Sequence, residues 1–131
     1  MRATLLVFFF GYLTYGQSNL DKYLWKNRVV VIFKTVHNDL KVKEQLEAFK
    51  EFPREIEDRQ IIILAPKKVE KSKFLERFGL DNDYSGLILL GKDGGIKLKE
   101  TLITKPQLLF DLIDAMPMRR AEMRNTSKKP N

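Results

Sequence analysis

The chain has 131 residues, of which 44% are hydrophobic and 31% are charged, and it contains no cysteine. This composition is typical of one folded domain and excludes a collagenous, repetitive or largely disordered chain. Without cysteine the protein forms no disulfide, offers no thiol nucleophile and has no cysteine-liganded metal site. The formal net charge of +7 is compatible with anionic partners.

The first eighteen residues, MRATLLVFFFGYLTYGQS, differ from the rest of the chain. Arg2 is their only charge, and an apolar run from Ala3 to Tyr15 is followed by small residues. This is the layout of a secretory signal peptide. The run is shorter than the roughly 20 residues that span a bilayer, which argues against an uncleaved anchor. We therefore expect an exported protein, periplasmic or extracellular, with a signal peptide at residues 1–18 and no transmembrane segment after cleavage.

Two continuous apolar runs, RVVVIFK at 28–34 and RQIIILAP at 59–66, predict strands that are buried on both faces. Between them, residues 38–52 place apolar side chains at helical spacing and predict an amphipathic helix. Asn38 is the expected N-cap of this helix. A strand, a helix and a second strand at this spacing indicate a right-handed βαβ unit.

The segment KSKFLERFGL at 71–80 predicts a second helix that ends at Gly79, where a left-handed residue suits a helix C-terminus. Residues 85–101 predict two strands joined by a tight turn at Asp93-Gly94. The second of these strands alternates apolar residues with lysines, which suits an exposed sheet edge.

The last predicted helix begins near Thr104, which forms a capping box with Gln107 in the sequence pattern. Its expected apolar face consists of Leu108, Leu109, Leu112, Ile113 and Met116. Pro117 ends this helix near Met116 and can begin another helical turn.

The resulting order, β-α-β-α-β-β-α, predicts a thioredoxin-like α/β fold with a central mixed sheet flanked by helices. We expect this domain to cover residues 19–124 and a basic flexible tail to follow at 125–131.

Three stretches also resemble a known family: LDKYLWKNRVVVIF at 20–33, FGLDNDYSGLILLGKDGGIKLKET at 78–101 and IDAMPMRRAEMR at 113–124. They resemble the bacterial family called domain of unknown function 4174. That family is similar to the peroxiredoxin-like domain of vertebrate sushi-repeat-containing matrix proteins. The resemblance implies a thioredoxin-like fold in an exported setting, without an established activity.

The usual redox site of this fold is missing from the sequence. The position just past the first strand, where thioredoxin-like enzymes carry a reactive cysteine, reads KTVHNDLK at 34–41 and holds no sulfur. Tyr84, Ser85 and Gly86 stand where such enzymes have a proline before the third strand. We therefore expect neither thiol-disulfide nor peroxidase activity.

His37 is the only histidine, and it lies beside the lost redox position. It could act as a general base or as one metal ligand, or it could be an exposed loop residue. Asp39 is the only acid close in sequence, whereas a metal usually needs three or four ligands and a base needs a positioned substrate. We expect no catalytic residue, metal or cofactor, and an enzyme with non-thiol chemistry near His37 remains the alternative.

The segment DAMPMRRAEMR at 114–124 presents a cluster of arginines beside a helix break. From Pro117 to Asn131 the chain has five lysines and arginines, and Glu122 is the only acid. Guanidinium groups suit phosphate, sulfate and carboxylate ligands. The candidate ligand-binding residues are Arg119, Arg120 and Arg124, with Lys92 as a weaker one. In the alternative interpretation the segment is only a helix terminus, tied back through Asp111 or Asp114.

These observations favour a non-enzymatic binding module for an anionic glycan, a lipid head group or an acidic protein surface. Nucleic acid fits the charge, but an exported protein rarely meets it and no recognised binding motif is present. A structural or assembly domain is a further alternative, which a large exposed apolar patch would favour.

Overall fold

The computed structural model describes residues 20–101 and 104–128. The expected signal peptide at 1–18 and the last three residues of the expected tail lie outside the described residues. In chain order the elements are η1 (Asp21–Tyr23), β1 (Arg28–Phe33), α2 (Asp39–Lys50), α3 (Pro53–Asp58), β2 (Ile61–Leu64), α4 (Lys68–Arg77), β3 (Gly86–Leu90), β4 (Ile96–Glu100), α5 (Pro106–Asp114) and α6 (Pro117–Lys128).

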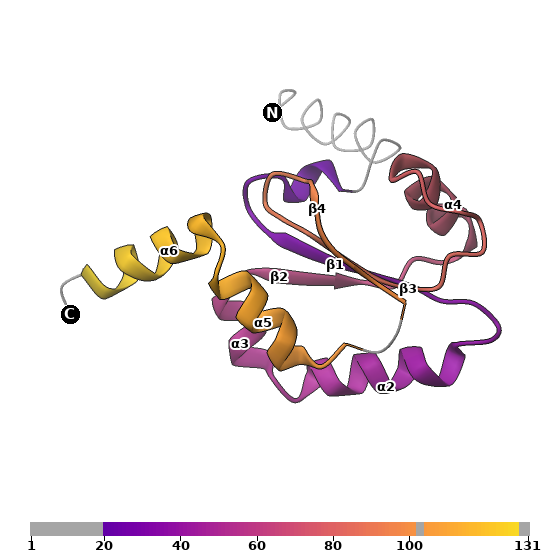
Figure 1. Cartoon of the computed structure of the whole chain (residues 1–131), viewed down its shortest axis with the longest axis horizontal. Coiled ribbons are helices and arrows are strands. Elements are labelled where there is room, and N and C mark those ends of the chain that lie inside the picture. The colour runs from indigo at the N-terminus through magenta and orange to yellow at the C-terminus, as the bar shows by residue number, and fades with distance from the viewer. Residues whose placement is uncertain (1–19, 102–103, 129–131) are drawn as a thin grey trace, which may run out of the picture.

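The four strands form one mixed sheet in the order β2-β1-β3-β4 (Figure 1). β1 runs parallel to β2, with Val31 opposite Leu64, and antiparallel to β3, with Val31 opposite Ile88. β3 and β4 form the antiparallel hairpin at the other side of the sheet. This mixed sheet flanked by helices is the thioredoxin-like arrangement that the element order predicted.

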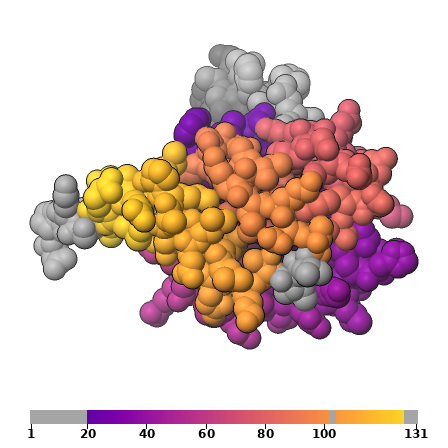
Figure 2. Space-filling model, in the orientation of Figure 1, coloured from indigo at the N-terminus to yellow at the C-terminus, as the bar shows by residue number. Residues whose placement is uncertain are grey.

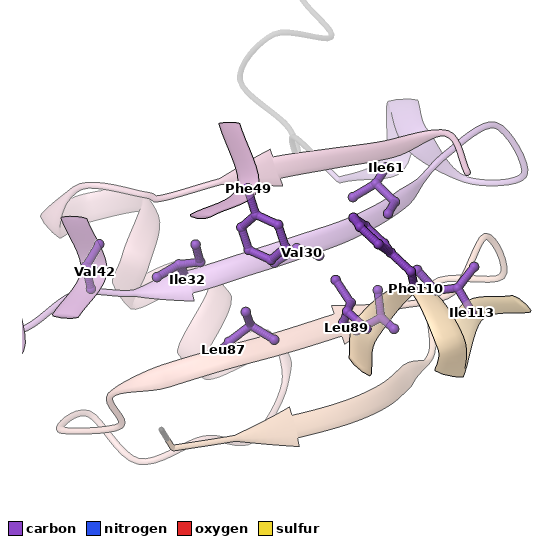
Figure 3. Packing of buried hydrophobic residues seen from close by; sticks show 10 residues of the cluster. Val30, Ile32, Val42, Phe49, Ile61, Leu87, Leu89, Phe110 and Ile113 are labelled. Carbon is purple, nitrogen blue, oxygen red and sulfur yellow. The ribbon is translucent and has the colours of Figure 1, made fainter. Parts of the chain in front are cut away.

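Both faces of β1 are covered, and all six of its residues are buried. On one face Val30 and Ile32 share a cluster with residues of α2 and α5, including Phe49 and Phe110 (Figure 3). On the other face Val31 and Phe33 pack in a second cluster with residues of α4. Burial on both faces explains why the strand is a continuous apolar run rather than an alternating one.

The hairpin between β3 and β4 follows the sequence prediction. Gly94 has a φ of 85°, a left-handed conformation that glycine adopts without steric cost. The turn is closed by the N–H of Gly91, which donates to the carbonyl of Gly95 at 2.9 Å. β4 carries Lys97 and Lys99 at the exposed sheet edge, where charges discourage further strand pairing.

Two expectations about the helices were wrong in detail. A separate helix, α3, lies between α2 and β2, because Pro53 at its first turn begins a new helix with the fixed φ of proline. In α5, Leu109 and Ile113 are buried as expected, but Leu108 is 62% exposed and Leu112 is also exposed. Phe110 is buried in their place. The buried face of α5 is therefore rotated about the helix axis from the face that the sequence predicted.

The predicted capping box at Thr104 does not form. Lys105 is the N-cap of α5, and no side chain caps the helix. Thr104 is buried and its backbone is held by Gln45 of α2: its N–H donates to Oε1 of Gln45 and its carbonyl accepts from Nε2, both at 2.8 Å. These two bonds fasten the start of α5 to α2, which satisfies buried backbone groups that would otherwise lack partners.

The proline break near the end of the chain is confirmed. α5 ends at Asp114 and α6 begins at Pro117. α6 then continues to Lys128, so the helix extends four residues into the segment that the sequence predicted to be a flexible tail from residue 125. The hydroxyl of Thr126 donates to the carbonyl of Glu122 (3.0 Å), one turn back in the same helix.

Candidate functional site: charged residues beneath the last helix

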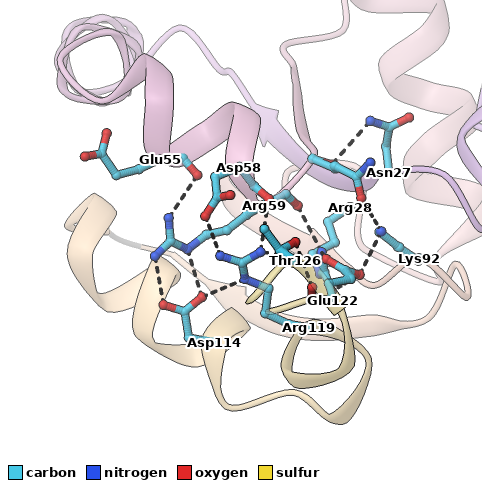
Figure 4. Close-up of polar contacts among 11 residues, drawn as sticks. Asn27, Arg28, Glu55, Asp58, Arg59, Lys92, Asp114, Arg119, Glu122 and Thr126 are labelled. Carbon is cyan, nitrogen blue, oxygen red and sulfur yellow. Dashed lines mark hydrogen bonds and ion pairs between the residues drawn. The ribbon is translucent and has the colours of Figure 1, made fainter. Parts of the chain in front are cut away.

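Arg28 begins β1 and is one of the most deeply buried charged residues, with 1% of its surface exposed. Its guanidinium contacts the carboxylate of Glu122 in α6 through both terminal nitrogens, at 3.2 and 3.1 Å (Figure 4). Nη1 also donates to the carbonyl of Arg59 at 2.9 Å. A two-point contact of this kind fixes direction as well as distance, so it orients α6 against the start of the central strand.

Lys92 follows β3 and reaches the same carboxylate. Its ammonium lies 2.8 Å from Oε2 of Glu122, and it also donates to the side-chain carbonyl of Gln60. Lys92 is only 8% exposed. Glu122 therefore compensates two buried cations that come from different parts of the sheet.

Arg119 lies one turn before Glu122 in α6 and is 5% exposed. Its Nη2 contacts Oδ2 of Asp58 at 2.6 Å, and its Nη1 donates to the backbone carbonyl of the same residue at 3.1 Å. Its Nε donates to Oδ1 of Asp114 at 3.0 Å. Arg119 thus joins the end of α3 to the end of α5.

Arg59 completes the arrangement from the segment before β2. Its Nε and Nη2 contact the two carboxylate oxygens of Asp114, at 3.0 and 2.8 Å. Its guanidinium also lies over the ring of Phe110, 4.7 Å from the centroid. We refer to Arg28, Asp58, Arg59, Lys92, Asp114, Arg119 and Glu122 together as the charge network.

The structure separates the four predicted ligand-binding residues into two groups. Arg119 and Lys92 belong to the charge network, and their side chains contact carboxylates of the protein itself. Arg120 and Arg124 are exposed on α6. The tie to Asp114 that the alternative interpretation envisaged is present, and it is made by Arg119.

Sequence reasoning missed Arg28 and Arg59 because each reads as a polar boundary of an apolar strand run. Their partners lie far away in sequence: Arg28 and Glu122 are 94 residues apart, and Arg59 and Asp114 are 55 apart. One feature of the sequence could have indicated the charge network: Glu122 is a single acid among five cations in the last fifteen residues.

An open groove of about 900 Å³ lies beside the network, between α3 and α6. It is lined by Arg54, Glu55, Glu57, Asp58, Arg59, Gln60, Arg119, Glu122, Asn125 and Thr126. Four carboxylates and three guanidiniums share this lining. Because both signs of charge are present in nearly equal number, the groove does not select an anionic ligand.

Glu122 and Asp114 both have a pKa that lies below the ordinary value of their side chains. Burial by itself raises the pKa of Glu122, but hydrogen bonds from Arg28 and Lys92 and their positive charges outweigh burial and leave this pKa below its ordinary value. In the same way burial raises the pKa of Asp114, and the contacts of Arg59 and Arg119 bring it below the ordinary value.

This depression predicts a loss of stability in acid. A carboxyl group whose pKa is lower in the folded state stabilises the protein fully above its unfolded value, here 4.5 for Glu122, and loses that contribution as the pH falls through the lower folded pKa. The difference in unfolding free energy between the wild type and Glu122→Gln should be constant near neutral pH and shrink below about pH 4.5. Urea titrations across this range measure it, and a difference that does not change with pH would contradict the role of the carboxylate charge.

The position of the missing redox cysteine is occupied by a hydrogen-bonded loop. The side chain of Asn38 accepts from the N–H of Thr35 (2.6 Å) and donates to the carbonyl of Phe33 (3.1 Å). Asn38 is the N-cap residue of α2 by position, but its side chain bonds back to the loop instead of capping the helix as the sequence predicted. Asn38 therefore has a structural role in closing this turn.

His37 lies exposed in the same loop, where its backbone N–H donates to the hydroxyl of Thr35 at 3.3 Å. Across residues 20–101 and 104–128, no group of three or more histidine and carboxylate side chains is placed to hold a metal ion.

The fold is a thioredoxin-like α/β arrangement, and the chain contains no cysteine. The chain belongs to the family described as Domain of unknown function (DUF4174), whose model matches residues 19–122. Searches of curated proteins and of solved structures returned no match. In the part of the chain that the structure describes, each helix is too short or too polar to cross a bilayer.

Proposed function

We propose that this chain is an exported, non-enzymatic binding module that recognises an anionic group through the exposed side of α6. The N-terminal sequence supports export. The absence of cysteine and the hydrogen-bonded loop at Asn38 support a role without thiol chemistry. Arg120 and Arg124 are the contacts that we assign to the anion.

The observation that carries this proposal is the way the charge network holds α6. Arg119 and Glu122 face the body of the domain and are fastened there by ion pairs to three other elements. The exposed arginines are therefore displayed on a helix whose orientation is fixed. α6 extends outward from the rest of the molecule, so a large partner can reach it (Figure 2).

A fixed helix lowers the cost of binding. A guanidinium on a mobile tail loses conformational entropy when it meets a ligand, whereas one on a docked helix loses only side-chain freedom. Two arginines on such a helix can engage separate oxygens of a sulfate, phosphate or carboxylate group. The ligand class therefore includes anionic glycans, lipid head groups and acidic protein surfaces.

The test is binding of the mature chain, residues 19–131, to dextran sulfate, phosphatidylglycerol vesicles and polyglutamate at low and physiological salt. We expect at least one of these probes to bind, and binding to weaken with salt because exposed charges are screened within about 8 Å at physiological ionic strength. Arg120→Ala/Arg124→Ala should weaken that binding about tenfold or more, since hydrogen bonds to charged groups are each worth about 1.5–3 kcal/mol.

The matched control is Lys97→Ala/Lys99→Ala, which removes the same charge from the exposed edge strand β4. It should retain most of the affinity if α6 is the site. An equal loss in both variants would indicate attraction by net charge alone, and unchanged binding in the arginine variant would remove α6 from the proposal.

A further inference from the structure

The parallel strands β1 and β2 have their carboxyl ends at the end of the molecule opposite α6 (Figure 1). After β1 the chain enters α2, which packs on the same face of the sheet as α5. After β2 the chain enters α4, which packs on the other face. In open α/β sheets, the crevice at the carboxyl ends of two adjacent strands whose connections leave to opposite faces is the usual position for a ligand. β1 and β2 are such a pair.

The surface at this end is apolar to an unusual degree. The three most exposed large hydrophobic side chains in the described part of the chain are Val36, Leu40 and Val69, at 89%, 73% and 71%. Val36 lies in the loop after β1, Leu40 in the first turn of α2 and Val69 in the first turn of α4. Single exposed apolar residues are ordinary on a protein surface, but these three all follow the carboxyl ends of the adjacent strands β1 and β2.

Lysines surround these apolar residues. The segments 34–43 and 67–71 contain six lysines and only two acids, Asp39 and Glu70. Asp39 is already engaged, because its carboxylate contacts Lys34 at 2.6 Å and Lys43 at 3.7 Å. Unlike the cations of the charge network, Lys41, Lys67 and Lys68 are exposed.

The two segments are in direct contact. The ammonium of Lys71 in α4 donates to the backbone carbonyl of Lys34 at 2.7 Å, which joins the first half of α4 to the loop after β1. Figure 1 shows this loop and α4 at the same end of the sheet, away from α6. We call the exposed apolar residues and the lysines of these two segments together the strand-end surface.

We propose that the strand-end surface docks a segment of another protein that carries both apolar side chains and carboxylates. The apolar residues supply the area that is removed from water, and the lysines select the charge of the partner and steer its approach. Charge complementarity also argues against a second copy of this chain, because two such surfaces would oppose lysine to lysine. The proposal is independent of the anion site on α6.

The experiment uses fluorescent peptides of about a dozen residues in four compositions: leucine with glutamate, leucine with lysine, serine with glutamate, and serine with lysine. Affinity for the mature chain is measured by fluorescence anisotropy. The leucine–glutamate peptide should bind at least about tenfold more tightly than each of the others, because only it satisfies both the apolar residues and the lysines.

Variants locate the binding on the protein. Val36→Ser/Leu40→Ser and Lys67→Glu/Lys68→Glu should each weaken binding of the leucine–glutamate peptide about tenfold. Leu108→Ser, at another exposed leucine, and Lys97→Glu/Lys99→Glu, at the far sheet edge, are the matched controls and should bind normally. Amide shifts in nuclear magnetic resonance spectra should concentrate at residues 34–41 and 67–71.

Several outcomes would overturn the proposal: no preference for the leucine–glutamate peptide, no detectable binding of any peptide, or equal losses in the variants and their controls. Self-association that disappears in Val36→Ser/Leu40→Ser would make the surface a contact between copies instead. Arg120→Ala/Arg124→Ala should not affect peptide binding. A loss there, with normal binding by Val36→Ser/Leu40→Ser, would leave α6 as the site and reject the strand-end surface.

Discussion

Replacing Glu122 by glutamine is expected to destabilise the domain by about 3 kcal/mol or more at neutral pH. The carboxylate compensates Arg28 and Lys92, which are 1% and 8% exposed, so its loss leaves two cations buried without a counter-charge. The amide of glutamine also turns a donor toward groups that can only donate. Urea unfolding followed by circular dichroism measures the difference.

Glu44→Gln is the matched control, because Glu44 lies exposed on α2. Its effect should stay within about 0.5 kcal/mol, as for most surface substitutions. Hydrogen exchange would show in addition whether the Glu122 variant releases α6 before the rest of the domain, through faster exchange in residues 117–128. A Glu122 variant as stable as its control would mean that the charge network contributes little to stability.

Replacing Gly86 by alanine is expected to destabilise the domain by roughly 2–4 kcal/mol. Gly86 begins β3 with a φ of 139°, a conformation that L-residues rarely adopt. A Cβ atom there would lie 2.1 Å from the carbonyl oxygen of Glu100 and 2.8 Å from the Cα of Thr101. Because both atoms belong to the backbone, β3 and β4 would have to separate. The same unfolding titration measures the cost.

Gly79→Ala is the control that separates backbone strain at a positive φ from the steric clash expected in Gly86→Ala. Gly79 follows the C-cap of α4 with a φ of 66°, but a Cβ atom there would meet nothing within 4 Å. The free energy of unfolding of this variant should fall by about 1 kcal/mol, which is the penalty for placing alanine in the left-handed conformation. Similar losses at the two glycines would show that the backbone around Gly86 relaxes without separating the strands.

Local patterns in the sequence were sufficient for most of the fold. The apolar runs at 28–34 and 59–66 contain β1 and β2, although only Ile61 of β2 is buried, because β2 lies at the edge of the sheet rather than inside it as expected. The turn at Asp93-Gly94 and the break at Pro117 depend on the backbone preferences of single residues. Such features are encoded by neighbours in the chain. The start of α5 was predicted to within two residues, but its capping box was not formed, because Gln45 of α2 binds the backbone of Thr104 instead.

The sequence by itself determined the class of fold, the absence of thiol chemistry and the excess of positive charge. Only the tertiary structure decided which cations are available to a partner. Arg119 and Arg120 are neighbours with the same side chain, yet one is directed at Asp58 and Asp114 while the other is exposed. The difference arises because a carboxylate that compensates a buried charge can come from anywhere in the chain, and its position is set only when the elements pack.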